Sequence, residues 1–138
     1  MKFTGTSRWT NETGGYEFRL SEDGTLVHLH DADLVKVDYR RDIGQLRLFF
    51  RYDQEFAEGL LRDRPFLALS FGKCTILEWQ DHLFSCDVTT DGPDLSVKLL
   101  DVHDGNTIVF ESVPVRIRFS TDEVQVVALT EMPPDELP

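Results

Sequence analysis

The chain has 138 residues, 41% of them hydrophobic and ten of them Phe, which is enough apolar mass for one well-packed domain and too much for a disordered chain. Its formal net charge of −11 argues against nucleic acid as a partner, because binding nucleic acid depends on Lys and Arg side chains that neutralise phosphates. The same charge suits a basic protein partner, since complementary electrostatic fields speed encounter. The alternative interpretation is that the charge only maintains solubility.

Short alternating apolar and polar runs, separated by turns, follow one another along almost the whole chain. Such runs at a spacing of about 8–12 residues are typical of a β-sandwich or β-barrel. We therefore predict an all-β fold, an antiparallel β-sandwich or flattened barrel of about ten short strands, as a single domain over residues 1–130. A flexible, acidic, Pro-rich tail is expected at 131–138. The predicted strands are 16–20, 25–30, 34–40, 45–52, 65–71, 73–79, 84–90, 95–101, 107–112, 114–120 and 123–130.

The predicted strand at 25–30 contains two histidines. If Val27 and Leu29 face the core, His28 and His30 share the outer face, where two imidazoles can bind one divalent transition metal. Asp31 or Asp33 can add an oxygen ligand. The His-x-His spacing is similar to the opening of the cupin metal motif, but the Glu and the second half of that motif are missing. The alternative is a pair of surface histidines at a strand end, and the leading expectation is that no cofactor is bound.

Two alternating runs flank a turn at 41–44 and predict an antiparallel hairpin over 34–52. Pairing Arg40 with Gln45 places one apolar set on the core face and one polar set on the other face. A register shift of one residue would expose the apolar set to water. In this register the apolar pairs are Val35 with Phe50, Val37 with Leu48, and Tyr39 with Leu46.

The outer face of this hairpin combines an aromatic ring with basic side chains. Arg and exposed aromatic residues are concentrated at binding hot spots. We therefore predict a partner-binding surface here. In the alternative interpretation, Asp38 pairs with Arg47 and the aromatic ring is covered by other parts of the fold. The predicted partner-binding residues are Lys36, Arg40, Arg47, Phe49 and Arg51.

Residues 53–62 break the strand pattern, because their apolar residues recur with the spacing of one helix face. Asp53 is a suitable N-cap, although Gly59 weakens the helix. We predict one short helix near 53–62. The run at 66–71 is apolar on both faces, which predicts a central strand covered on both sides.

Cys74 and Cys86 fall on successive predicted strands, in a register that separates them too far for a disulfide. We expect two buried free thiols and a reducing compartment. The acidic stretches at 91–94 and 101–106 lack the D-x-D-x-D-G order of a calcium loop and are interpreted as hairpin turns. No hydrolase elbow, phosphate loop, zinc-protease helix or redox pair is present in the sequence, which favours a protein without enzymatic activity.

The segment His30-Asp31-Ala32-Asp33-Leu34, followed by Val37, Gly44, Leu46, Leu48 and Phe50, resembles a pattern in small bacterial β proteins of unassigned function. Some of these resemble immunity proteins of bacterial toxin systems. The resemblance covers about residues 30–50, implies an intracellular β protein that acts by binding, and carries over no catalytic residue.

These observations together predict a non-enzymatic protein-binding domain, with an immunity-type inhibitor of a basic partner as its specific form. The alternative is a small metal- or ligand-binding β barrel that uses His28 and His30. No apolar leader follows Met1 and no run approaches the length of about 20 apolar residues that spans a membrane. We therefore expect a cytoplasmic protein without a membrane partner, and the sequence leaves its oligomeric state open.

Overall fold

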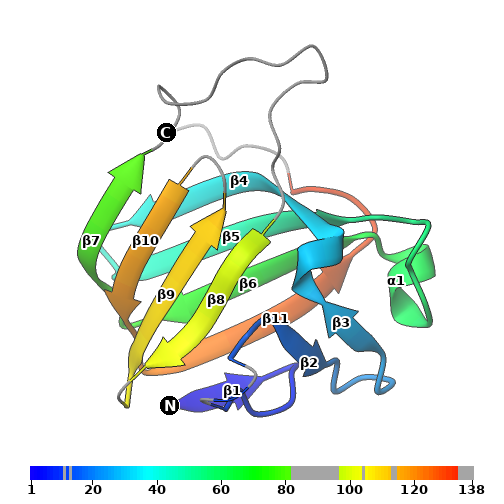
Figure 1. Ribbon diagram of the computed structural model, residues 1–138, viewed down its shortest axis with the longest axis horizontal. Coiled ribbons are helices and arrows are strands. Elements are labelled where there is room, and N and C mark those ends of the chain that lie inside the picture. The colour runs from blue at the N-terminus through cyan, green and yellow to red at the C-terminus, as the bar shows by residue number, and fades with distance from the viewer. Residues whose placement is uncertain (11, 13, 82–96, 104, 113–114, 134–138) are drawn as a thin grey trace.

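The computed structural model describes residues 1–10, 12, 14–81, 97–103, 105–112 and 115–133, and it is a β-sandwich. Figure 1 looks onto the four-stranded sheet, with the five-stranded sheet behind it and a small two-stranded sheet beside them. None of the sheets formed by these residues closes into a barrel, so the sandwich is the correct one of the two predicted architectures.

The larger sheet has the order β1-β11-β6-β5-β4 and the smaller of the two main sheets the order β7-β10-β9-β8. The five-stranded sheet consists of β1 (Lys2–Thr4), β11 (Glu123–Leu129), β6 (Phe66–Gly72), β5 (Gln45–Tyr52) and β4 (Ala32–Arg40). The four-stranded sheet consists of β7 (Thr75–Asp81), β10 (Val115–Ser120), β9 (Thr107–Ser112) and β8 (Val97–His103). The small sheet pairs β2 (Glu17–Arg19) with β3 (Leu26–His28), and the helical segments are η1 (Leu29–Asp31) and α1 (Leu60–Asp63).

Most of the predicted strands are confirmed to within two or three residues at each end, including the central position of β6 between β5 and β11. The three-residue strand β1, which pairs in parallel with β11, was not predicted. The predicted strand at 84–90 lies outside the described residues, as do Cys86 and the acidic stretch at 91–94.

The predicted hairpin is confirmed, because Arg40 pairs with Gln45 and Val37 with Leu48. The predicted pairing of Val35 with Phe50 is wrong. The register shifts between Leu34 and Lys36, so Leu34 takes the place opposite Phe50 and Val35 becomes the extra residue of a β-bulge. Leu34 is therefore buried, whereas 48% of Val35 is exposed.

The outermost long strands of both main sheets share this feature. Leu77 is an extra residue on β7 where it pairs with β10, and Lys98 occupies the same kind of position on β8 where it pairs with β9. Bulges at sheet edges bend and twist the strand, which hinders pairing with a further strand. Among the described strands, each edge of the two main sheets is thus either bulged or, at β1, only three residues long.

The predicted helix at 53–62 is wrong in extent, because only Leu60–Asp63 is helical. The Asp53 carboxylate accepts a hydrogen bond from the backbone N–H of Glu55, at 2.9 Å, and so stabilises a turn in place of a helix N-terminus. Gly59 then has a φ of 52°, and a Cβ at this position would lie 2.3 Å from the Thr25 hydroxyl. Glycine is required there, and the helix begins only after it.

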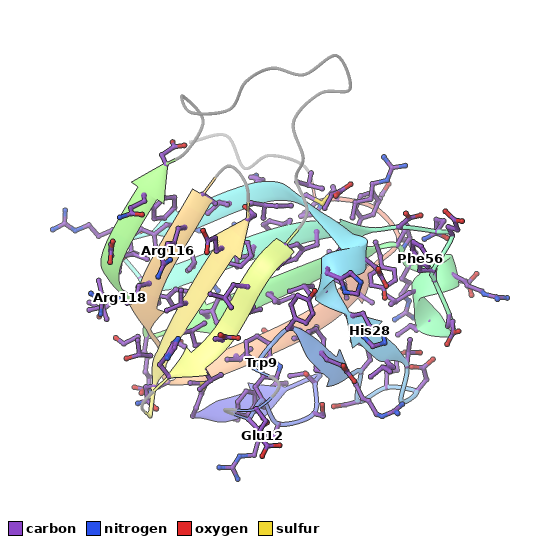
Figure 2. The ribbon with its side chains drawn as sticks, in the orientation of Figure 1. Trp9, Glu12, His28, Phe56, Arg116 and Arg118 are labelled. Atoms are coloured by element: carbon purple, nitrogen blue, oxygen red, sulfur yellow. The ribbon has the colours of Figure 1, made fainter. Side chains whose placement is uncertain are left out.

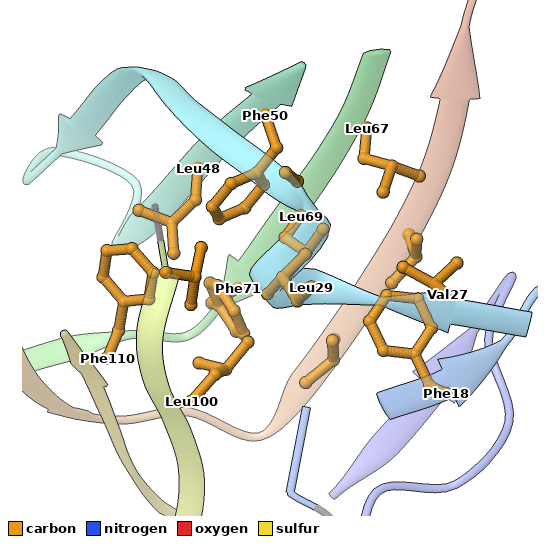
Figure 3. Close-up of a cluster of buried hydrophobic side chains, with 14 of the residues drawn as sticks. Phe18, Val27, Leu29, Leu48, Phe50, Leu67, Leu69, Phe71, Leu100 and Phe110 are labelled. Atoms are coloured by element: carbon orange, nitrogen blue, oxygen red, sulfur yellow. The ribbon is translucent and has the colours of Figure 1, made fainter. Parts of the chain in front are cut away.

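The core lies between the two main sheets and is one continuous hydrophobic cluster that extends from Trp9 to Ala128. Two aromatic pairs connect the layers: Phe71 and Phe119 have ring centroids 4.8 Å apart, and Phe50 and Phe110 are 5.9 Å apart. Both pairs have the edge-to-face geometry that aromatic rings favour. Figure 3 shows Phe18 and Val27 extending this cluster toward the small sheet, which is thereby packed onto the sandwich.

Among the residues that the structure describes, no helix has the length and apolar character needed to cross a membrane.

Candidate functional site

The β2–β3 pair and the η1 turn bring together a cluster of imidazole, carboxylate and phenol groups at one side of the sandwich. Glu17 and His28 stand directly opposite each other in the register of β2 and β3. The backbone N–H of Leu29 donates to the carbonyl of Tyr16 at 2.7 Å, and Leu29 is fully buried. This turn carries His30 back toward Tyr16, beside the position of His28 shown in Figure 2.

The expectation that His28 and His30 share the face of one strand is wrong, because β3 ends at His28 and His30 lies in the 3₁₀ turn η1. The two rings are nevertheless neighbours, with centroids 6.1 Å apart. The His30 ring also stacks on Tyr16, with centroids 5.4 Å apart and planes 13° from parallel. The structure therefore brings the two predicted imidazoles together by a different route.

Each imidazole faces its own carboxylate. Nδ1 of His28 lies 3.6 Å from Oε2 of Glu17, and Nε2 of His30 lies 3.0 Å from Oδ1 of Asp31. Asp31 is the more deeply placed carboxylate, with 16% of its side chain exposed, compared with 47% for Glu17. As they stand, the described His, Cys, Asp and Glu side chains form no group of three or more that surrounds a metal ion.

Tyr52 contacts this cluster from the interior of the protein. Its side chain is buried, and its hydroxyl oxygen accepts a hydrogen bond from the backbone N–H of His28 at 3.2 Å. Burial raises the pKa of Tyr52, and the nearby negative charge of Asp31 raises it further, while the His28 N–H acts in the opposite direction. The phenol therefore stays protonated and accepts the hydrogen bond from the His28 backbone.

The predicted partner-binding residues lie on the outer face of the five-stranded sheet, turned away from the core. Phe49 is buried there, although it lies outside the core cluster. The ammonium of Lys36 and the guanidinium of Arg47 lie 5.9 Å and 5.5 Å from the centroid of its ring. Arg47 also forms the predicted ion pair with Asp38, and Arg40 lies 3.9 Å from the carboxylate of Asp42.

Phe49 is therefore not an exposed aromatic residue, and its ring packs against the cations of Lys36 and Arg47. Arg51, at the end of the strand, is exposed. The structure thus places Lys36, Arg47 and Arg51 around Phe49, with Arg40 further along toward the turn.

Two apolar rows that sequence reasoning missed cross this same outer face. In the register of β5, β6 and β11, Phe49 stands beside Ala68, and Ala68 beside Val127. In the adjacent row, Phe66 stands beside Leu129. Val127 is 39% exposed, and Phe66 and Leu129 are partly exposed. The solvent-facing side of an antiparallel sheet is normally polar, so these rows are unusual.

The outer face of the four-stranded sheet differs from this arrangement. Arg116 and Arg118, labelled in Figure 2, lie 3.7 Å from the Glu111 carboxylate and 3.5 Å from the Glu78 carboxylate. The partners stand opposite each other on neighbouring strands. Arg116 and Arg118 are therefore each matched by a carboxylate on a neighbouring strand.

Cys74 is a buried free thiol, as predicted. Burial raises its pKa to about 12, so the thiolate needed for nucleophilic attack or metal binding is scarce at neutral pH. Its backbone N–H donates to the Gly44 carbonyl at 2.7 Å, which ties the start of β7 to the turn between β4 and β5. The surroundings of Cys74 are therefore those of a structural residue.

Comparisons with protein-family models, with curated proteins and with solved structures find no match for this chain. The resemblance to immunity proteins therefore stays a prediction from the sequence.

Proposed function

We propose that this chain is a non-enzymatic protein-binding domain and that the outer face of its five-stranded sheet contacts the partner. The observation that carries the proposal is the pair of apolar rows on this face. Phe66, Val127 and Leu129 are at least partly exposed on two neighbouring strands, and Ala68 stands opposite Val127 in the sheet. Exposed apolar side chains that are contiguous on one face are typical of interaction surfaces.

The charges around these rows define the chemistry of the partner. The outer side of β4 and β5, with the turn between them, carries four cations, Lys36, Arg40, Arg47 and Arg51, against the carboxylates of Asp33, Asp38 and Asp42. Arg51 makes no ion pair with the described residues. This local positive excess, in a chain of net charge −11, suits a protein surface with an apolar centre and carboxylates at its rim.

The net charge supports a second candidate. An immunity-type inhibitor of a basic protein would use the acidic remainder of the surface for its approach and contact. The two candidates respond differently to charge reversal. Arg51→Glu weakens binding to an acidic patch, whereas the same change leaves unaltered or strengthens binding to a basic partner.

The experiment is affinity capture from an extract of the source cells on the immobilised chain, with three variants alongside the wild type. Val127→Glu places a negative charge in the apolar row, and Arg51→Glu reverses one of the positive charges beside it. Thr107→Glu adds the same negative charge to the outer face of the four-stranded sheet and is the matched control. We expect a protein that is retained by the wild type and by Thr107→Glu and lost with Val127→Glu. Sets of retained proteins that do not differ between these variants would contradict the proposal.

Sedimentation of the purified chain at several concentrations tests whether the partner is a second copy of this chain. A mass that rises with concentration, and does so less with Val127→Glu, would show that the partner is a second copy of this chain.

A further inference from the structure

We propose that Glu17, His28 and His30 bind one divalent first-row transition metal ion, and that Asp31 orients His30 for this role. Glu17 and His28 already have the spacing of two ligands of one ion. Their facing atoms are 3.6 Å apart, which is too long for a hydrogen bond. Two ligand atoms on a tetrahedral zinc ion, each bonded at about 2.0–2.1 Å, lie roughly 3.4 Å from each other.

A close contact between His30 and Asp31 prepares the third ligand. Nε2 of His30 lies 3.0 Å from Oδ1 of Asp31, so Nδ1 is the ring nitrogen that can bind a metal ion. Metal-binding histidines commonly have their second ring nitrogen beside a carboxylate, which fixes the ring and raises the basicity of the ligand nitrogen.

The separation of the two rings is compatible with one shared ion after a small movement. The centroids are 6.1 Å apart, and two imidazoles on one tetrahedral zinc would have centroids roughly 5 Å apart. The side chains of Glu17, His28 and His30 are 47%, 40% and 50% exposed, so rotation about their side-chain bonds meets little packing. Tyr16, stacked on His30, is the contact that such a rotation must keep or slide along.

The donor set selects the class of metal. Two imidazole nitrogens with one carboxylate oxygen favour zinc, cobalt, nickel or copper over calcium and magnesium, which prefer oxygen ligands. Three protein ligands on an exposed surface leave at least one coordination position to water.

The experiment uses the full chain, purified without an affinity tag, stripped with a chelator and titrated with Co²⁺ and then with Zn²⁺. Cobalt reports its geometry through visible absorption, and zinc competes for the same site. We expect one ion per chain, absorption typical of four-coordinate cobalt, and loss of this signal on addition of zinc. His28→Ala and His30→Ala are expected to abolish saturable binding, and Glu17→Gln to weaken it.

Two further variants separate the roles. Asp31→Asn is expected to weaken binding about 10–100-fold without changing the number of ions bound, as is typical for a partner that orients a ligand. His103→Ala is the matched control, because His103 lies on β8 in the four-stranded sheet. This variant should bind cobalt like the wild type.

Absence of saturable binding by the wild type would overturn the inference. So would binding that survives in both His28→Ala and His30→Ala, since it would show an adventitious ion only. Circular dichroism and urea unfolding of each metal-free variant establish that it is folded, so a lost signal reports lost ligands. The result does not depend on the protein-binding proposal, whose binding variants Val127→Glu and Arg51→Glu lie on the outer face of the five-stranded sheet.

Discussion

The β-bulge in β4 predicts opposite consequences for two neighbouring apolar residues. Leu34 is 6% exposed and belongs to the core cluster, whereas Val35 is 48% exposed. In a strand of unbroken alternation their positions would be reversed, because the register fixed at Arg40 would place Val35 in the core. Leu34→Ala is therefore expected to lower the free energy of unfolding by about 2–3 kcal/mol, at the lower end of buried Leu truncations. Val35→Ala is expected to lower it by about 0.5 kcal/mol or less.

Urea unfolding followed by tryptophan fluorescence measures both changes. With a urea dependence of about 2 kcal/mol per molar, typical of a small domain, Leu34→Ala should lower the midpoint by about 1–1.5 M and Val35→Ala by about 0.3 M or less. The two variants remove apolar groups from adjacent positions of one strand, so each is the control for the other. A larger loss for Val35→Ala than for Leu34→Ala would refute the bulge and restore the unbroken register.

Three further predictions concern ionisable groups. In a Cys86→Ser background, Cys74 should resist alkylation at pH 8 and react on addition of denaturant, as measured by mass spectrometry, because its buried thiol has a pKa of about 12. Tyr52→Phe should lower the free energy of unfolding by about 1–3 kcal/mol at pH 7 in urea melts. Since the pKa of Tyr52 is raised in the folded state, the wild type should lose stability as the pH rises above about 10, and the variant should show less of this loss. Hydrogen bonds from Thr25 and Leu60 lower the pKa of Asp23, so the stability difference between wild type and Asp23→Asn should shrink as the pH falls below the ordinary value of 3.8.

Alternation along the chain was sufficient to predict most strands, because each strand has one face on the core and one toward solvent. It was insufficient at Leu34 and Val35, where two consecutive apolar residues fit either register. The pairing of Arg40 with Gln45 determines the register only near the turn, and an extra residue further along the strand leaves no mark in the pattern. The position of the bulge is decided by which side chain packs better between the sheets.

The helix prediction failed because a local interaction competes with helical spacing. Asp53 can cap a helix or close a turn with its own neighbours, and the turn forms because Gly59 interrupts the predicted helix. Leu61 still reaches the core, and Phe56 is left 54% exposed. Apolar spacing therefore identified two buried residues of the segment correctly, Ala57 and Leu61, and assigned them to too long a helix.

The candidate metal site was only half visible in the sequence. His28, His30 and Asp31 are close in the chain, so their spacing was informative. Glu17 becomes their neighbour only through the β2–β3 pairing, and Tyr52 reaches the His28 backbone from 24 residues away. No local pattern contains such contacts.

The apolar rows of the outer face did leave a signal. Residues 126–129 are four consecutive apolar residues on a strand, as are 66–69, and a strand that is apolar on both faces must place side chains away from the core. The sequence interpretation used this signal for 66–71 to predict a covered strand. It did not connect that strand with 126–129, because strand order is not readable from the sequence.

The bulged edges and the apolar face together restrict how a partner can dock. Leu77 and Trp79 are exposed on β7, and an exposed edge strand is a common place for a partner to add a strand of its own. The bulge at Leu77 interrupts the regular row of backbone groups that such pairing needs, as Val35 does on β4. Binding to the outer face of the five-stranded sheet uses side chains and needs no unpaired backbone groups. We therefore favour contact on that face. Val127→Glu distinguishes the two modes, because a strand added to β7 would pair through its backbone and be indifferent to a charge on β11.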